Sequence, residues 1–285
     1  MEELYRIGYN HFMRNKLTDE LAICGLKAVI AVVENHPEQI NRLFLREDRL
    51  KSFTAICKSL AERKRPYKIC EDEELEKICK SNHHQGVVAM IFLPALESLS
   101  REDLDEWAAE GKTGLVLHSV GNDHNLGAIA RSAAFFDVKY IVVSESYEYR
   151  SDIHSSAENS KEPNAVLTTS AYRTAEGGLE HVTVRTIRNT ASFLKDASRQ
   201  LITIGTDPRA RRRIGDLQRI VEEKQKAASG SRPGIALVLG NEETGLSDEV
   251  KHACSVLLRI PGTGIMESLN VAQTAAIFMH RVFEL

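Results

Sequence analysis

The stretch Ile235-Ala236-Leu237-Val238-Leu239-Gly240-Asn241-Glu242 joins a short apolar run to a polar turn. A second polar segment, Glu267-Ser268-Leu269-Asn270-Val271-Ala272, follows it and opens a helical pattern. Each segment offers backbone amides and an acid or amide side chain with little bulk nearby, which suits a small, charged, adenosine-like ligand. An apolar run of this length, bounded by turn residues, is typical of a strand buried on both faces of a parallel sheet.

Similar apolar runs precede this one at residues 114–117, 140–143 and 201–204, and each leads into a helix-like segment. This alternation predicts an α/β domain with a mostly parallel sheet, whose ligands bind beyond the carboxyl ends of the strands. The chain contains neither a Gly-x-Gly-x-x-Gly run nor a Walker loop, so common phosphate loops are not indicated. Its glycines gather near the two polar segments, which predicts a cofactor pocket in the C-terminal third.

The N-terminal third has a shorter rhythm of its own. A helical stripe predicts a helix over residues 18–33, and strand formers predict strands over 40–45, 67–70 and 87–93. Further helices are expected at the positions between these strands, namely residues 51–62 and 71–80. We therefore expect a small α/β/α domain over residues 1–93, a linker with a short acidic helix over 94–112, and a second domain over 113–285.

The length and the net charge of the chain limit the classes of function that it can have. With 285 residues and a formal net charge of -3, the chain can form two domains and is not expected to coat nucleic acid nonspecifically. Two local basic clusters stand out, Arg63-Lys64-Arg65 and the arginines at 209 and 211–213. A solvated surface and a phosphate-binding surface are equally good interpretations of either cluster taken alone.

Metal and membrane dependence are not predicted. The five cysteines contain no Cys-x-x-Cys pair and the ten histidines show no metal-ligand spacing, so the cysteines are expected to be buried and the pair His83-His84 to lie in a turn. The chain begins with acidic residues, and its longest apolar run, residues 28–33, is too short to cross a bilayer. We expect a cytoplasmic protein.

Three segments together resemble a known family. Residues 125–133 (Asn-Leu-Gly-Ala-Ile-Ala-Arg-Ser-Ala), residues 239–246 (Leu-Gly-Asn-Glu-Glu-Thr-Gly-Leu), and Ile260-Pro261-Gly262 continuing to residues 268–272 match, in order and spacing, the three motifs of the SpoU (TrmH) family. That family comprises S-adenosylmethionine-dependent RNA ribose 2′-O-methyltransferases of the SPOUT superfamily. The resemblance covers about residues 113–285, and residues 1–93 look like the RNA-binding substrate domain found ahead of it.

The resemblance implies several further properties. The second domain should carry a trefoil knot, an exception to the general avoidance of knots. The enzyme should methylate transfer or ribosomal RNA and form a homodimer through its last helix. The stretch Arg173-Thr174-Ala175-Glu176-Gly177-Gly178 and the two-domain layout also resemble the YfiF branch of the family.

Residue roles are carried over from the family motifs. The resemblance implies that backbone groups of Gly240, Ile260 and Leu269, with Thr206, bind S-adenosylmethionine. It also assigns a catalytic set: Arg131, Asn125, Glu242, Ser268 and Asn270. A guanidinium holds its proton too tightly to be a good base, so Arg131 is expected to orient the ribose hydroxyl and stabilise developing alkoxide charge.

Some alternatives stay open. Glu242 is expected to fix Arg131 or a neighbouring backbone, and Asn125 and Asn270 to hold the loops and the RNA. Ser268 is equally suited to be the N-cap of a final helix over residues 269–283. The apolar positions of that helix fit a dimer interface or an internal core, namely Ala272, Ala275, Ala276, Met279 and Phe283. The competing function is a catalytically silent RNA-binding or ribosome-associated protein with the same fold.

Overall fold

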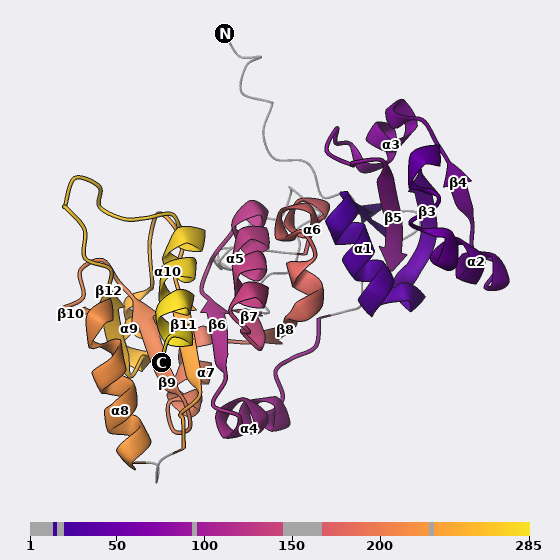
Figure 1. The fold of residues 1–285 in the computed structure, drawn as a ribbon. Coiled ribbons are helices and arrows are strands. Elements are labelled where there is room, and N and C mark those ends of the chain that lie inside the picture. Colours follow the sequence, from indigo (N-terminus) through magenta and orange to yellow (C-terminus); the bar gives the residue numbers. More distant parts are fainter. Residues whose placement is uncertain (1–13, 16–19, 93–95, 145–166, 228–230) are drawn as a thin grey trace, which may run out of the picture. The chain divides into compact units, whose positions relative to one another are not determined.

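The computed structural model describes residues 14–15, 20–92, 96–144, 167–227 and 231–285 (Figure 1). The chain forms two compact units. The N-terminal unit comprises Met1–Pro94 together with Leu167–Gly177, and the C-terminal unit comprises Ala95–Val166 together with Gly178–Leu285. A segment from the middle of the chain is therefore part of the first unit.

The N-terminal unit contains a mixed five-stranded sheet in the order β1-β2-β5-β3-β4. The β3–β4 pair is parallel and the other pairs are antiparallel. Its strands are β1 (Arg14–Asn15), β2 (Glu20–Cys24), β3 (Ile40–Leu45), β4 (Tyr67–Ile69) and β5 (Val87–Phe92). Its helices are α1 (Leu26–Asn35), η1 (Pro37–Gln39), η2 (Glu47–Arg49), α2 (Thr54–Glu62), α3 (Asp72–Cys79) and α6 (Thr169–Ala175).

The helix predicted over residues 18–33 is wrong in its first half. Residues 20–24 form β2, and the helix α1 begins only at Leu26. Between them Gly25 has a φ of 99°, a backbone conformation that residues other than glycine rarely adopt. All five residues of β2 are buried, so its apolar run has no period of two to distinguish it from a helix. Residues 18 and 19 lie outside the described residues.

Helix α6 packs in the N-terminal unit, although its sequence position alone assigns it to residues 113–285. It contacts β2 and α1, and Ala171 and Tyr172 are buried there. Polar contacts add to this packing, since Arg173 Nη1 donates to Ser81 Oγ at 2.7 Å and Lys27 Nζ lies 2.7 Å from Glu176 Oε2. Such contacts across the chain leave no local pattern in the sequence.

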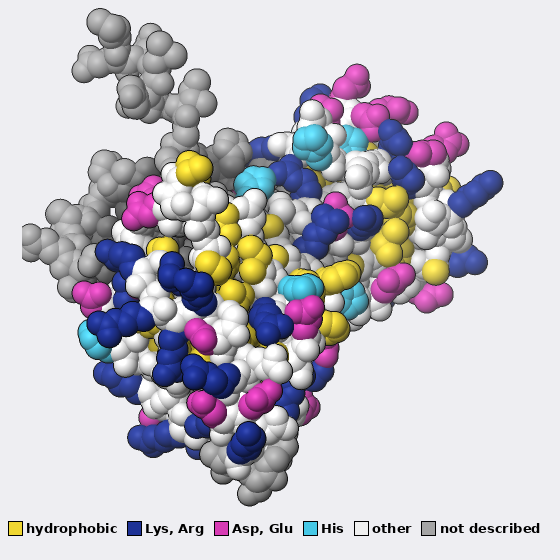
Figure 2. All heavy atoms as spheres, turned by 60° about the vertical axis from the view of Figure 1, so that its left-hand side comes forward, with side chains coloured by type: hydrophobic (Ala, Val, Ile, Leu, Met, Phe, Trp, Pro, Cys, Tyr) yellow, Lys and Arg dark blue, Asp and Glu magenta, His cyan; other side chains and the backbone are white. Residues whose placement is uncertain are grey.

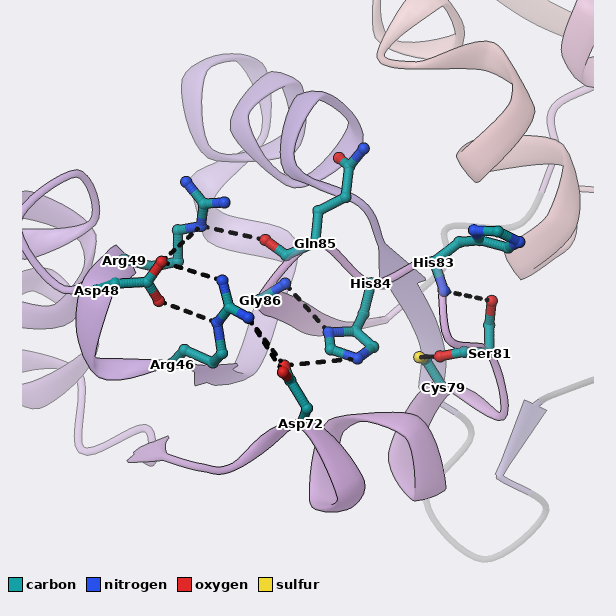
Figure 3. A network of polar contacts seen from close by, with 10 residues as sticks. All are labelled: Arg46, Asp48, Arg49, Asp72, Cys79, Ser81, His83, His84, Gln85 and Gly86. Atoms are coloured by element: carbon teal, nitrogen blue, oxygen red, sulfur yellow. Dashed lines mark hydrogen bonds and ion pairs between the residues drawn. The ribbon is translucent and has the colours of Figure 1, made fainter.

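The two adjacent histidines lie in the loop between α3 and β5, consistent with the predicted turn (Figure 3). His84 is buried, and its Nδ1 accepts a hydrogen bond from the backbone N–H of Gly86 at 3.1 Å. Its Nε2 lies 3.8 Å from Asp72, which also pairs with Arg46 at 3.1 Å. The loop is thereby tied to the start of α3. Among the described residues, no group of three His, Cys, Asp or Glu side chains could hold a metal ion.

The C-terminal unit contains a seven-stranded, fully parallel sheet in the order β10-β12-β9-β11-β6-β7-β8. Its strands are β6 (Thr113–Leu117), β7 (Tyr140–Ser144), β8 (Thr183–Ile187), β9 (Ile202–Thr206), β10 (Arg212–Arg213), β11 (Ile235–Leu239) and β12 (Val256–Arg259). Its helices are α4 (Arg101–Ala109), α5 (Asp123–Phe135), η3 (Gly178–His181), α7 (Thr190–Ala197), η4 (Ile214–Asp216), α8 (Leu217–Ala227), α9 (Asp248–Ala253) and α10 (Val271–Phe283).

Both faces of this sheet are covered. Side chains of α4, α7 and α9 form one core with Val116 and Val238 of the central strands. Strand neighbours that point the other way, such as Leu115 and Leu237, are also fully buried. Helices α5 and α10 pack side by side, and α10 also contacts β11 (Figure 1). Two-sided burial explains why the central strands β6, β7 and β11 are almost entirely apolar in sequence.

The predicted mostly parallel α/β architecture is confirmed. The trefoil knot implied by the family resemblance stays a prediction. Within the described ranges, no helix is long and apolar enough to cross a membrane.

Candidate functional site

The loop after β11 is shaped by one asparagine. Asn241 Oδ1 accepts hydrogen bonds from the backbone N–H groups of Glu243 and Thr244, at 2.9 and 3.0 Å. Its Nδ2 donates to the carbonyl of Ser119 at 2.9 Å, which ties this loop to the one after β6. Asn241 was not among the predicted site residues. Its place at the head of an Asn-x-x-Thr-Gly turn is the signal that could have found it.

Gly240 lies where this loop folds back on itself. A Cβ atom at Gly240 would lie 2.4 Å from the backbone carbon of Gly245 and 2.6 Å from the amide nitrogen of Leu246. Atoms do not approach that closely, and backbone cannot move aside as a flexible side chain can. The loop therefore requires glycine at this position, and its main chain comes unusually close to the next turn.

A chain of side-chain hydrogen bonds joins the three predicted segments. Asn270 Nδ2 donates to Asn125 Oδ1 at 3.0 Å, and Asn125 Nδ2 donates to Glu242 Oε1. Asn125 lies in the first turn of α5, Glu242 in the loop after β11, and Asn270 directly before α10. Residues far apart in sequence thus meet at one place, as their resemblance to a single set of motifs predicted.

Asn270 also begins the last helix. Its Oδ1 accepts a hydrogen bond from the backbone N–H of Ala272 at 2.8 Å, so Asn270 is the N-cap and α10 starts at Val271. The alternative role of Ser268 as this cap is therefore wrong. Ser268 is exposed and makes no hydrogen bond within the described residues.

The four predicted cofactor contacts lie around neighbouring strand ends. Thr206 is the last residue of β9, Gly240 follows β11 and Ile260 follows β12. These three strands are adjacent and parallel, so their carboxyl ends share one edge of the sheet. Thr206 Oγ1 donates to the carbonyl of Val238 at 3.2 Å, which fixes the side chain against β11. Leu269 belongs to the segment that leads from this edge into α10.

The segment between β12 and α10 has the chemistry that S-adenosylmethionine requires. Residues 261–270 are all exposed, and three of them are large and apolar: Ile265, Met266 and Leu269, which are 85%, 77% and 45% exposed. The backbone of Leu269 makes no hydrogen bond within the described residues, so its polar groups are open to a ligand. Apolar side chains beside open backbone groups suit an adenine ring and its polar edge. The residues present therefore fit this cofactor.

Arg131 lies on the same helix as Asn125 but on another face. Six residues along an α-helix correspond to about 9 Å of rise and a net rotation of about 120°. Arg131 is exposed, and η3 packs closely on its backbone, since a Cβ at Gly178 would lie 2.7 Å from Arg131 Cα. Within the described residues, Glu242 bonds to Asn125. The expected role of Glu242 in fixing Arg131 or a neighbouring backbone stays a prediction.

Two family models match the chain and together span most of it. The model described as "SpoU rRNA Methylase family" matches residues 112–280, which is more than half of the chain. The model described as "RNA 2'-O ribose methyltransferase substrate binding" matches residues 22–96.

Named relatives agree with these matches. The chain is 26% identical over 271 residues to the "Uncharacterized tRNA/rRNA methyltransferase YfiF" of Escherichia coli O157:H7, covering 94% of this chain and 69% of that protein. It is 29% identical to the "23S rRNA (guanosine-2'-O-)-methyltransferase RlmB" of Nitrosomonas europaea, covering 94% and 92%. The SpoU methyltransferase AviRb from Streptomyces viridochromogenes, solved with AdoMet, shares the fold, with a TM-score of 0.67 at 20% identity over 93% of this chain and 89% of that one. The chain belongs to the SpoU rRNA methylase family of S-adenosylmethionine-dependent RNA ribose 2′-O-methyltransferases.

Proposed function

We propose that this protein methylates a ribose 2′-hydroxyl of ribosomal or transfer RNA in the cytoplasm. The observation that carries the proposal is the hydrogen-bonded chain Asn270–Asn125–Glu242, which joins the three motif segments beside the ends of β9, β11 and β12. One relative is named as an uncharacterized tRNA/rRNA methyltransferase and the other as a 23S rRNA methyltransferase, which supports these two classes of RNA. The N-terminal unit is assigned the capture of RNA, supported by the substrate-binding model that matches residues 22–96.

We assign the site residues to two roles: some bind the cofactor, and others position and activate the acceptor hydroxyl. S-adenosylmethionine, when bound, supplies an electrophilic methyl group. We assign its binding to the backbone at Gly240, Ile260 and Leu269, with Thr206 at the neighbouring strand end. Backbone groups offer a donor and an acceptor for the adenine edge without loss of side-chain entropy.

The acceptor hydroxyl needs a different environment, because it is a poor nucleophile until its proton is shared or lost. We assign Arg131 to orient this hydroxyl and to stabilise the negative charge that develops on its oxygen. Asn125, Glu242 and Asn270 keep the three loops in register. Ser268 is exposed directly before this cluster, where we assign it a contact with the RNA.

The activity has a direct test. Purified protein is incubated with methyl-labelled S-adenosylmethionine and with unmodified ribosomal or transfer RNA, and the product is digested and mapped by mass spectrometry. We expect one 2′-O-methylated nucleotide that is absent from reactions without protein. If the protein binds RNA but neither binds the cofactor nor transfers label, it is instead the catalytically silent RNA-binding protein.

We also propose that the protein is a homodimer that pairs through α5 and α10. Among the apolar residues predicted for an interface, Ala275 and Met279 are buried inside the unit and serve its own core. Other apolar side chains on these two helices are exposed: Phe135 at 79%, Phe283 at 60% and Ile277 at 39%. Exposed large apolar side chains on two adjacent helices are typical of an interaction surface.

Replacing this apolar surface with charge should separate the dimer. We expect the double variant Ile277→Asp with Phe283→Asp to sediment as a monomer at concentrations where the wild type is dimeric, because a buried unpaired carboxylate opposes association. Ile69→Asp, at an equally exposed apolar position in the N-terminal unit, is the matched control and should remain dimeric. A wild type that sediments as a monomer throughout would contradict the proposal.

A further inference from the structure

The edge of the C-terminal sheet carries two adjacent arginines. Strand β10 is the edge strand and pairs in parallel with β12, with Arg213 opposite Arg259. Residues opposite each other in a sheet point to the same face, on strands about 4.8 Å apart. Two like charges placed in this way repel each other and weaken the pairing. An anion between them would remove that cost.

Four of the arginines in this region have no acid of their own among the described residues. Within the described residues, the side chains of Arg211, Arg212, Arg213 and Arg259 make no ion pair. The nearby Asp216 accepts from the backbone N–H of Arg213 at 2.8 Å and lies 3.9 Å from Arg219 Nη2. The Nε of Arg259 is buried without a hydrogen-bond acceptor. A buried donor left without a partner costs about 1–3 kcal/mol, so an acceptor from a ligand would be favoured here.

Arg212, the neighbour of Arg213 on β10, points to the opposite face of the sheet. With Arg209 and Arg211 it lines a depression of about 430 Å³. The acid in this depression is Asp207, whose carboxylate lies 3.0 Å from Lys251 Nζ and 3.9 Å from Arg209 Nε. Burial alone would raise the pKa of Asp207, but the backbone N–H of Arg209 and the Lys251 ammonium hold it below its usual value. Asp207 is thus ionised and already paired with Lys251, which leaves the depression positively charged.

The other basic cluster of the sequence differs from this one. In the N-terminal unit, Arg63 donates to the carbonyl of Pro37 at 3.1 Å, and Arg65 donates to Asn41 and lies over the ring of Phe92 at 5.7 Å. Those guanidinium groups are therefore already engaged in hydrogen bonds or a ring contact within their own unit. Within the described residues, the side chains of Arg211, Arg212, Arg213 and Arg259 make no ion pair, and Figure 2 shows Lys and Arg side chains gathered on the side of the molecule where β10 and β12 lie.

The position of this edge relates it to the proposed active site. Arg259 is the last residue of β12 and directly precedes Ile260, to which we assign a cofactor contact. Strand β12 also pairs with β9, which ends at Thr206. Arg213 is likewise the last residue of β10, so an anion bound between Arg213 and Arg259 lies at the carboxyl ends of the strands, where we assign the methyl donor.

We propose that an arginine groove, formed by Arg209, Arg211 and Arg212 at the depression and extended around the edge strand by Arg213 and Arg259 on its other face, binds consecutive phosphates of the RNA backbone beside the nucleotide that is methylated. This assignment rests on the proposed function. RNA phosphates are favoured over the carboxylate of the cofactor because five arginines spread over a groove exceed what one carboxylate can engage. Guanidinium groups bind phosphate oxygens in a bidentate manner, and several such contacts in a row follow a nucleic acid strand.

The salt dependence of RNA binding tests this assignment. In vitro transcribed 23S ribosomal RNA is titrated with wild type and with the triple variant Arg211→Gln, Arg212→Gln, Arg213→Gln at several salt concentrations. Each phosphate contact contributes about 0.7–0.9 to the slope of log affinity against log salt, so we expect the slope to fall by about two to three and low-salt affinity to fall about tenfold or more. These side chains are exposed, so the fold should be unaffected.

A matched control removes the same charge from other exposed positions of this unit, with Lys195→Gln, Arg199→Gln and Lys224→Gln. The control should keep the wild-type slope. At the partly buried position, Arg259→Lys should retain RNA affinity that Arg259→Gln loses, while S-adenosylmethionine affinity measured by calorimetry stays unchanged in both.

The outcomes of these experiments distinguish failure of the proposed methyltransferase function from failure of the arginine groove alone. If the wild type neither binds nor methylates RNA, the proposed function itself fails. If the wild type methylates RNA and the triple variant keeps the full salt slope, only the arginine groove is wrong. If Arg259→Gln instead weakens cofactor binding and leaves RNA binding intact, the anion at this edge is the cofactor carboxylate and the assignment to RNA is overturned.

Discussion

Arg131→Ala is expected to abolish most methyl transfer while leaving S-adenosylmethionine binding intact. The substitution removes the cation that we assign to the developing alkoxide, and loss of one such preorganised group typically lowers kcat by about 10²–10³. Arg131 is exposed on α5, and the backbone that η3 packs against is unchanged by the substitution, so folding should not suffer. Single-turnover transfer of labelled methyl, together with calorimetric titration of the cofactor, measures both effects.

Arg131→Lys serves as the companion variant. It keeps the positive charge but loses the planar fork that can engage a hydroxyl and a phosphate together, so its rate should lie between those of wild type and Arg131→Ala. The role given to Arg131 is wrong if Arg131→Ala loses cofactor affinity instead, or if it transfers methyl at the wild-type rate.

The second large effect is expected at Gly240. In Gly240→Ala the new Cβ would meet backbone atoms of Gly245 and Leu246 at 2.4–2.6 Å, so the loop after β11 must move. Overpacking of this kind costs about 1–3 kcal/mol of unfolding free energy. Because the displaced main chain is a proposed cofactor contact, affinity for S-adenosylmethionine should fall about tenfold for each ~1.4 kcal/mol of contact energy lost.

Gly215→Ala is the matched control, since a Cβ there meets nothing within 4 Å. Thermal unfolding followed by circular dichroism gives the stability change, and titration calorimetry gives the cofactor affinity. Equal behaviour of the two alanine variants in both measurements would show that the close approach at Gly240 does not shape the binding site.

The parallel sheet could be predicted from the sequence because its strands are buried on both faces. Short apolar runs such as Ile235–Leu239, each ended by Gly or a polar residue, leave little choice of structure. The same two-sided burial misled the prediction for Glu20–Cys24, where a strand joined directly to a helix looked like one long helical stripe. Only the φ of Gly25, which a sequence does not display, separates the two elements.

The sequence predicted a set of site residues but not the contacts between them. Motif order brought Asn125, Glu242 and Asn270 into one hypothesis, and the structure joins them by hydrogen bonds. The sequence did not reveal that Asn270 rather than Ser268 caps α10, because either residue type makes a good cap. Among the described residues, Arg259 Nε is buried without an acceptor; this depends on the neighbours that the fold supplies, and no local pattern encodes it.

The placement of α6 has a consequence for how this protein can be divided. Ala171 and Tyr172 bury apolar surface against β2 and α1, so a fragment that stops at the end of β5 would leave that surface exposed to water. Recombination between relatives therefore has to respect two separate segments of chain, since an exchanged N-terminal module needs Leu167–Gly177 from the same parent. Over evolution, substitutions in Leu167–Gly177 are therefore expected to accompany substitutions in the residues of β2 and α1 that this segment contacts.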